Sequence, residues 1–117
     1  MSNFSELDDM MGYNALNTDI FATEVPLETM KTSYKVFEVC RQMVTTGNPN
    51  SVSDAGVGAL AARAAVIGAG MNVKINAASL KDREKAEALI AEADALVEKA
   101  NAEEKEITQT VEEMIRK

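Results

Sequence analysis

The sequence predicts an all-α protein, a multihelical bundle with a long C-terminal helix. Aromatic residues make up only 4% of its 117 residues and there are two prolines, whereas Ala, Glu and Lys are abundant. These three residue types lose little entropy in a helix, and strands favour β-branched and aromatic side chains. Apolar residues also recur at steps of three and four, and residues 79–117 contain no Gly or Pro. A chain of this size forms one domain with one small core.

The first expected helix covers residues 23–46. It follows a loose arm or short helix in residues 1–22, where Asp, Gly and Asn interrupt any apolar period. Pro26 suits a first helical turn, where its missing N–H costs nothing. Gly47 stands where helices commonly end, and the segment 48–51 (Asn-Pro-Asn-Ser) cannot easily continue a helix. The apolar stripe of this helix consists of Leu27, Met30, Tyr34, Phe37, Cys40 and Val44.

The second expected helix covers residues 54–78, with Ser51 or Ser53 as its N-cap and Asp54 near the positive end of the helix dipole. It carries two unlike faces. An ordinary apolar stripe comprises Val57, Leu60, Ala64, Ile67, Met71 and Ile75. A face of small residues with polar ends comprises Asp54, Gly58, Ala61, Ala65, Gly68, Ala69, Asn72 and Asn76. Small residues let a backbone or a flat ligand approach closely, so we expect both faces to be covered inside a bundle.

The last expected helix begins at a capping box, Ser79 to Asp82, and runs to Lys117. Its seam repeats every seven residues, as in coiled coils. At 1.5 Å per residue it is about 50 Å long, so we expect it to protrude or to be completed by oligomerisation. The seam consists of Ala86, Ala93, Ala100, Ile107 and Met114, with Ile90, Val97 and Val111 as companions.

Composition narrows the possible functions. The formal net charge is −7 with no cluster of Lys and Arg, which disfavours nucleic acid as a partner. Histidine, the commonest metal ligand and general base, is absent, and we expect no metal. Residues 55–71 come nearest to a membrane span, but Arg63 near their middle makes insertion costly, so we expect no membrane partner. A single cysteine, Cys40, and no leader sequence predict a cytoplasmic protein.

Four segments carry a family resemblance: Ala-Thr-Glu-Val-Pro-Leu at 22–27, Gly-Asn-Pro-Asn-Ser-Val-Ser-Asp-Ala-Gly-Val-Gly-Ala-Leu at 47–60, Asn-Val-Lys-Ile-Asn at 72–76 and Leu-Lys-Asp at 80–82. From about Phe21 onwards the chain resembles formimidoyltetrahydrofolate cyclodeaminases and bacterial methenyltetrahydrofolate cyclohydrolases. The resemblance implies a multihelical fold that dimerises and takes a tetrahydrofolate derivative as its substrate. The cyclodeaminases close formimidoyltetrahydrofolate to methenyltetrahydrofolate with loss of ammonia, and the cyclohydrolases hydrolyse the methenyl bridge.

Family domains are nearly twice as long and carry a Pro-Gly-Gly-Gly-Ser type motif in an N-terminal half, which this sequence lacks. The resemblance therefore implies that residues 21–117 are the C-terminal part of such a domain, after an arm at 1–20 with no clear family match. We expect a homo-oligomer or a complementary chain to complete it. An alternative is a truncated, non-catalytic family member that serves helical assembly. A third possibility, a coiled-coil adaptor, has no need of the loop at 48–51.

Asp54 is the candidate catalytic residue. As a general acid or base inside the bundle it would manage protons at folate N10 or at departing ammonia, although Asp is also favoured at helix starts for electrostatic reasons alone. Asn48, Asn50 and Ser51 are candidate substrate-binding residues, because amides and a hydroxyl on a rigid loop suit a pterin ring. Ordinary turn chemistry explains the same three residues.

Three further residues are candidate substrate-binding groups. Arg63, with Lys74 as its rival, would hold the anionic glutamate tail of folate, unless each forms a salt bridge or lies in solvent. Asn72 and Asn76, four residues apart on the face of small residues, either line a folate cleft or satisfy a contact between helices. Gly56, Gly58, Gly68 and Gly70 fit no phosphate loop and are expected at positions of close packing.

Overall fold

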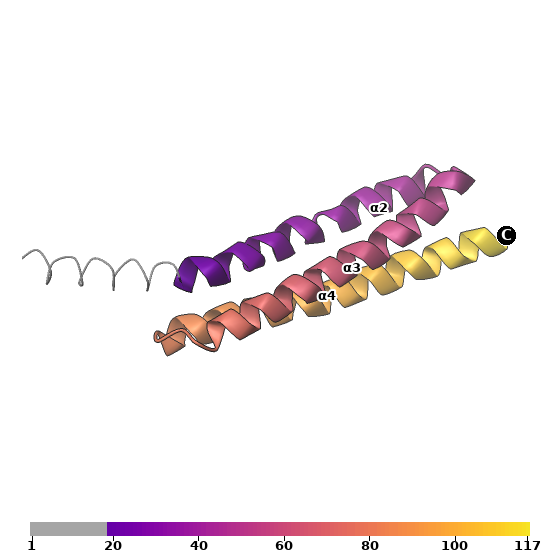
Figure 1. Ribbon diagram of the computed structural model, residues 1–117. Coiled ribbons are helices and arrows are strands. Elements are labelled where there is room, and N and C mark those ends of the chain that lie inside the picture. Colours follow the sequence, from indigo (N-terminus) through magenta and orange to yellow (C-terminus); the bar gives the residue numbers. More distant parts are fainter. Residues whose placement is uncertain (1–18) are drawn as a thin grey trace, which may run out of the picture.

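The computed structural model describes residues 19–117, which are helical except for short connections (Figure 1). A helical segment, 19–34, is followed after a turn at Lys35 by α2 (Val36–Thr45), α3 (Pro49–Ala77) and α4 (Arg83–Arg116). The described residues contain no strand, which confirms the all-α prediction and the long C-terminal helix. Most of the arm predicted for residues 1–22 lies outside the described part of the chain, but residues 19–22 are already helical.

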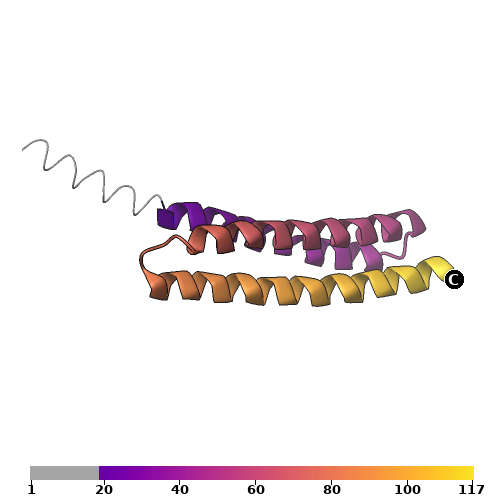
Figure 2. The same ribbon diagram turned by 60° about the horizontal axis from the view of Figure 1, so that its bottom comes forward.

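The three long rods lie along one another (Figures 1 and 2). Segment 19–34 and α2 continue in nearly one direction, α3 returns beside them, and α4 runs back along α3. Each pair among α2, α3 and α4 is in contact. The expectation that α4 is too long to be covered by so small a chain is therefore wrong, because α3 and the rod formed by 19–34 and α2 are both long enough to accompany it.

The helix ends differ from the prediction in detail. Gly47 has a φ of +71°, the left-handed conformation expected after a helix end. Asn48, not Ser51 or Ser53, caps α3: its side-chain oxygen accepts a hydrogen bond from the Asn50 amide at 3.0 Å, and Pro49 occupies the first turn. Helix α4 is capped by Asp82, which accepts from the Lys85 amide at 3.0 Å. The capping box predicted from Ser79 is therefore wrong.

Pro26 lies inside a helix and not in its first turn, because the helical segment already includes Asp19. A proline at this position removes the N–H that would bond the carbonyl four residues earlier, on Ala22. The side-chain amide of Asn76, on α3, donates to that carbonyl at 2.9 Å. A residue fifty positions away thus satisfies the acceptor that Pro26 leaves unpaired.

The core is built from the predicted stripe of the first helix and the predicted seam of α4. Leu27, Met30, Phe37 and Cys40 are buried, as are Ala86, Ala93, Ala100, Ile107 and Val111. Three glycines of α3 lie where a side chain would meet a neighbour: Gly56 against Val111, Gly58 against Cys40 and Gly70 against Met30. Glycine at these positions allows the helices to approach closely, which confirms the packing role expected for them.

Helix α3 turns a different side to the core than the sequence predicted. The buried side, called here the covered face, consists of Val52, Ala55, Gly56, Ala59, Ala62, Val66, Ala69, Gly70, Val73 and Ala77. The predicted apolar stripe is instead largely exposed: Val57 is 67%, Leu60 50%, Met71 65% and Ile75 71% accessible. Alanine and glycine let α3 approach its neighbours closely, so the larger side chains are left outside. The expectation that both predicted faces are covered is wrong for a single chain.

Helix α3 is long and apolar enough, by length and composition, to cross a membrane. The core helix of a soluble protein passes the same test, and α3 places a buried side against α2 and α4. Arg63, near its middle, is tied to α4 by a hydrogen bond. These features describe a helix that packs against protein.

Candidate functional site

The N-cap of α3 and its first two turns carry four of the predicted site residues. Asn48, Asn50 and Asp54 are exposed, and Ser51 is half-buried. The side-chain oxygen of Asn48 is engaged in capping α3. Asp54 lies in the second turn of α3, since no acidic residue occupies the first turn, and it is open to solvent. The expectations that Asp54 starts the helix and that the bundle interior surrounds it are therefore wrong for one chain.

A groove at this end of the bundle adjoins the loop. It has a volume of about 430 Å³ and is lined by Gly47, Pro49, Val52, Met114, Ile115 and Lys117. The lining is mostly apolar, with the Lys117 ammonium as its charged group. A volume of this order suits a small ligand.

Asn72 and Asn76 border a second groove, of about 300 Å³, between segment 19–34 and α3. Its other lining residues are small or apolar, namely Ala22, Val25, Pro26, Thr29 and Ala69. Asn76 uses its side-chain nitrogen to donate to the Ala22 carbonyl. The predicted contact between helices is therefore real for Asn76, and its side-chain oxygen has no hydrogen-bond partner among residues 19–117.

The structure does not bring the two groups of predicted residues together. From Asn48 to Asn72 the chain advances 24 residues along one straight helix, about 36 Å at 1.5 Å per residue. The loop therefore lies at one end of α3 and the groove with Asn72 and Asn76 towards the other. Within one chain they form two separate sites.

Arg63 and Lys74 lie on the side of α3 that faces α4. Arg63 donates from Nε to the side-chain oxygen of Asn101 at 2.7 Å, and Lys74 forms an ion pair with Asp94. The alternative to a role in folate binding was that each cation forms a salt bridge or lies in solvent. Lys74 forms such a salt bridge, and Arg63 forms a hydrogen bond with an amide of α4. The structure does not bring Arg63 into either groove, and neither groove's lining includes it.

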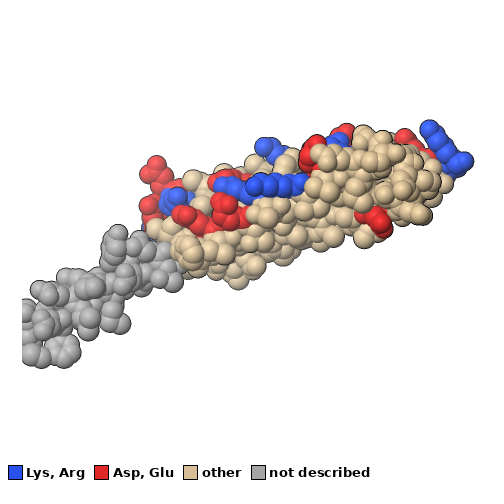
Figure 3. Space-filling view, turned by 90° about the horizontal axis from the view of Figure 1, so that it is seen from above, with Lys and Arg blue, Asp and Glu red and all other residues tan. Residues whose placement is uncertain are grey.

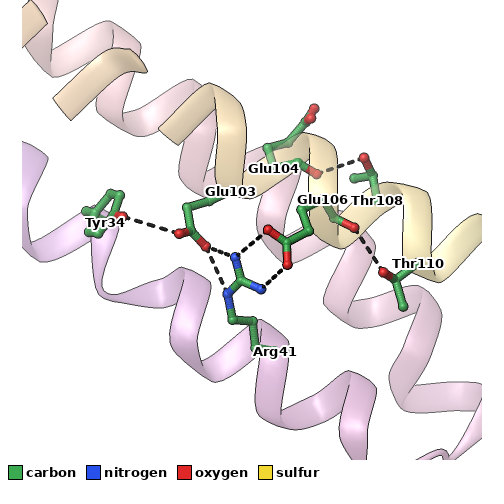
Figure 4. A network of polar contacts seen from close by, with 7 residues as sticks. All are labelled: Tyr34, Arg41, Glu103, Glu104, Glu106, Thr108 and Thr110. Atoms are coloured by element: carbon green, nitrogen blue, oxygen red, sulfur yellow. Dashed lines mark hydrogen bonds and ion pairs between the residues drawn. The ribbon is translucent and has the colours of Figure 1, made fainter. Parts of the chain in front are cut away.

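A polar network between α2 and α4 was missed at the sequence level (Figure 4). Arg41 on α2 donates to Glu103 and to Glu106 on α4, at 2.9 Å from Nε to the former and from Nη1 to the latter, and Tyr34 donates to Glu103 at 3.4 Å. The Arg41 guanidinium holds the pKa of Glu106 below its ordinary value. Desolvation, with a contribution from Glu103, raises the pKa of Tyr34. The spacing of charges along a single helix cannot predict these contacts, because Arg41 precedes its partners by about sixty residues in the sequence.

Among the described residues, every ion pair that joins two different helices includes a residue of α4. Its partners on the first rod are Glu24, Lys31 and Arg41, and its partner on α3 is Lys74. The molecule accordingly has a charged side and an uncharged side. Figure 3 shows charged side chains gathered along one edge of the face drawn, with a broad uncharged area beside them.

Comparison with known proteins identifies the family of this chain. The family model for formiminotransferase-cyclodeaminase matches residues 16–95, which include the loop at 48–54 and both asparagines of the groove. The chain belongs to this family. A methenyltetrahydrofolate cyclohydrolase of Methylorubrum extorquens is 36% identical over 94 residues, which are 80% of this chain. The matched region is 45% of the length of that enzyme.

Both groups of predicted site residues fall within the region that matches the family, although they lie far apart in one chain. Helix α3 contains most of both groups and lies wholly inside the matched region, as does the first rod from residue 19 onwards. Residues 96–117 lie beyond it and include Glu103 and Glu106. The network around Arg41 therefore has its α4 partners outside the family match, in keeping with a stabilising role between helices.

Proposed function

We propose that this protein acts in folate one-carbon metabolism, on a tetrahydrofolate derivative. Membership of the family supports the proposal, together with its 36% identity to a protein named methenyltetrahydrofolate cyclohydrolase. The reaction is either hydrolysis of a methenyl bridge or closure of a formimidoyl group with loss of ammonia. The matched region is 45% of that relative's length. A second copy or a complementary chain is the proposed source of further site residues. A reducing cytoplasm, in which the buried Cys40 remains a thiol, is the proposed compartment.

The groove between segment 19–34 and α3 is the proposed seat of the folate ring. It is an open, shallow groove whose walls are mostly apolar, which suits one face of a flat ring system, and the amides of Asn72 and Asn76 would supply hydrogen bonds to ring nitrogens and oxygens. Val25 and Pro26 line the opposite wall. The interaction between Asn76 and the Ala22 carbonyl fixes one side-chain orientation, so that its oxygen is held ready to accept.

Asp54 is the proposed general acid or base, and Asn48, Asn50 and Ser51 are the proposed hydrogen-bonding groups around the reacting end of the substrate. These residues lie far from the groove within one chain, so we propose that another copy or a complementary chain supplies them to it. Both reactions take place at an amidine-like carbon between two nitrogens. In hydrolysis, a carboxylate accepts a proton from the attacking water; in cyclisation with loss of ammonia, a carboxylic acid gives a proton to the departing nitrogen. Amide donors beside that carbon stabilise charge as it moves.

Turnover of methenyltetrahydrofolate, followed by its absorbance, tests the hydrolytic form of the proposal, and ammonia release from formimidoyltetrahydrofolate tests the other. Asp54→Asn is expected to abolish turnover with an unchanged circular dichroism spectrum. Glu113→Gln, which alters an exposed carboxylate on α4, is the matched control and is expected to keep the wild-type rate. A wild-type rate in Asp54→Asn would reject the role of Asp54.

The second candidate function is that of a non-catalytic family member that serves helical assembly. The observation in its favour is the apolar side of α3 that stays exposed, since contiguous exposed apolar residues mark sites of contact with other proteins. Calorimetric titration with a tetrahydrofolate derivative separates the two functions. A saturable heat supports the folate function, and its absence supports assembly alone.

A further inference from the structure

The proline of the first rod stands where a helix tolerates it least. Pro26 is half-buried in the middle of the helical segment 19–34. Proline is the least favourable residue in a helix interior, because it has no N–H and its ring clashes with the carbonyl four residues earlier. That carbonyl belongs to Ala22, which lines the groove between this segment and α3. Pro26 therefore leaves one backbone acceptor free at the wall of the groove.

The side-chain amide of Asn76 takes up this free acceptor. Its Nδ2 donates to the Ala22 carbonyl at 2.9 Å, and Asn76 is half-buried on α3. An amide has a donating end and an accepting end, whereas a backbone carbonyl can only accept. The nitrogen of Asn76 must therefore face Ala22, and its oxygen is turned away from that carbonyl. With any other residue at position 26, a backbone N–H would bond the carbonyl and the amide could turn either end to the groove.

The groove contains little else that could recognise a polar ligand. None of the described residues that line it has an ionisable side chain. The hydroxyl of Thr29, another lining residue, already donates to the Val25 carbonyl at 3.3 Å. An amide oxygen of fixed direction in an uncharged, mostly apolar wall favours a ligand with a neutral N–H donor at its edge and a flat face to lie on the wall.

We propose that Pro26 is a positioning residue of this groove. By leaving the Ala22 carbonyl free, it fixes the direction of the Asn76 amide, so that the groove prefers a flat ring with an amino group at the contacted edge over one with a carbonyl there. The nature of the ring rests on the proposed folate function, since the pteridine of a tetrahydrofolate carries an amino group at its 2-position. The direction of the amide does not depend on that function.

The direction of the amide is tested without a ligand, by nuclear magnetic resonance of ¹⁵N-labelled protein. The heteronuclear Overhauser effect of the Asn76 side-chain amide is expected to equal that of the α3 backbone in the wild type and to fall clearly in Pro26→Ala. The variant is expected to fold, because alanine favours the helix. Glu28→Ala, at an exposed position of the same helical segment that keeps the backbone N–H groups unchanged, is the matched control and is expected to match the wild type.

Two outcomes of this measurement overturn the positioning role. A mobile Asn76 amide in the wild type would show that the hydrogen bond to Ala22 does not hold in solution. An equally ordered amide in the wild type and in Pro26→Ala would show that the proline is not the cause of the order. The exposed amide of Asn72, which lines the same groove, provides the reference for a mobile side chain.

The preference for an amino group is tested by fluorescence titration with two rings, 6-methylpterin and 6-methyllumazine. They differ only in an amino or an oxo group at position 2, and both are neutral at slightly acidic pH. The wild type is expected to bind the pterin about tenfold more tightly, the effect of one hydrogen bond. In Pro26→Ala the ratio of the two dissociation constants is expected to approach one, because the freed amide can turn its nitrogen to the oxo group. A purely structural role of Pro26 would weaken both rings equally.

The results separate this inference from the proposed function. Equal binding of the two rings by the wild type, or an unchanged preference in Pro26→Ala, would overturn the inference and leave the folate function intact. If the wild type binds neither ring and no tetrahydrofolate derivative, the proposed function is rejected and the ring preference with it. The order of the Asn76 amide then decides by itself whether Pro26 positions that side chain.

Discussion

The two sides of α3 are similar in composition and differ in what they contact. The covered face is dominated by Ala, Val and Gly and meets α2 and α4. The open face, which is the exposed side of α3 with Val57, Leu60, Met71 and Ile75, has the larger apolar side chains but no partner among residues 19–117. On α3 the buried residues are those that let neighbouring helices approach closely, and not those with the largest side chains. Small residues allow close crossing, and the contacts of the backbone then compensate for the smaller side chains.

Replacing the largest buried side chain of the core is expected to give the largest effect on stability. Phe37 is 2% exposed and packs edge-on against Tyr34, with ring centroids 5.5 Å apart. Phe37→Ala is expected to lower the free energy of unfolding by about 3–5 kcal/mol, from lost burial and the cavity left behind. Val39→Ala, two residues away and 54% exposed, is the matched control and is expected to change it by less than about 0.5 kcal/mol in the monomer. Urea denaturation measures both, and equal effects would contradict the burial of Phe37 and the exposure of Val39 on α2.

Sequence periodicity predicted one helix well and another poorly, for a physical reason. On the first rod the stripe with Leu27, Met30, Phe37 and Cys40 was predicted to face the core, and it does, whereas Phe21, Val25, Val36 and Val39 lie outside that stripe and are exposed. Helix α3 is apolar on nearly every side, and periodicity cannot say which side meets a neighbour in the same chain. Large residues were therefore assigned to the core, where alanine and glycine actually lie.

The candidate site shows the same limit. The Asn48-Pro49 turn and the left-handed Gly47 are local features, and the sequence predicted them. The hydrogen bond from Asn76 to the Ala22 carbonyl joins residues 54 positions apart, and it depends on the missing N–H of Pro26. No local pattern carries that information. The family motifs point to candidate site residues, and in one chain these residues lie in two separate places.

Replacing two glycines of α3 by alanine is expected to give the next largest effects on the free energy of unfolding, with opposite signs. Gly56→Ala places a Cβ about 3.2 Å from Val111 Cγ1, a rigid neighbour, and is expected to destabilise the protein by roughly 1–3 kcal/mol. Gly68→Ala, on the open face, meets nothing and is expected to stabilise the monomer by about 1 kcal/mol, since alanine favours the helix. Unfolding is measured at a protein concentration where light scattering shows a single chain. Destabilisation of that monomer by Gly68→Ala would show that the open face is covered within the chain.

The hydrogen bond from Asn76 to the Ala22 carbonyl, which Pro26 leaves without a partner in its own helix, gives a smaller effect. Asn76→Ala is expected to cost about 1 kcal/mol, because the Ala22 carbonyl loses its partner. In a Pro26→Ala background, the restored N–H bonds the same carbonyl within the helix, so the further change Asn76→Ala is expected to cost close to nothing. Asn72→Ala, in the same groove, serves as the control in both backgrounds. Additive effects of the two substitutions would contradict the pairing.

The stability contributed by the ion pairs on the charged side of the molecule is expected to depend on pH. The Arg41 guanidinium, by hydrogen bonding and then by its charge, lowers the pKa of Glu106 from its ordinary 4.5. A carboxyl whose pKa is lower in the folded state contributes stability that is present above pH 4.5 and is lost as the pH falls through the folded-state pKa. The urea midpoint is therefore expected to fall more steeply below pH 4.5 in the wild type than in Glu106→Gln, which has no proton to bind. The difference is small because Glu106 is exposed, and Glu113→Gln, further along α4, is expected to follow the wild-type curve. Parallel curves for wild type and Glu106→Gln would mean that the ion pair with Arg41 does not stabilise the contact between α2 and α4 in solution.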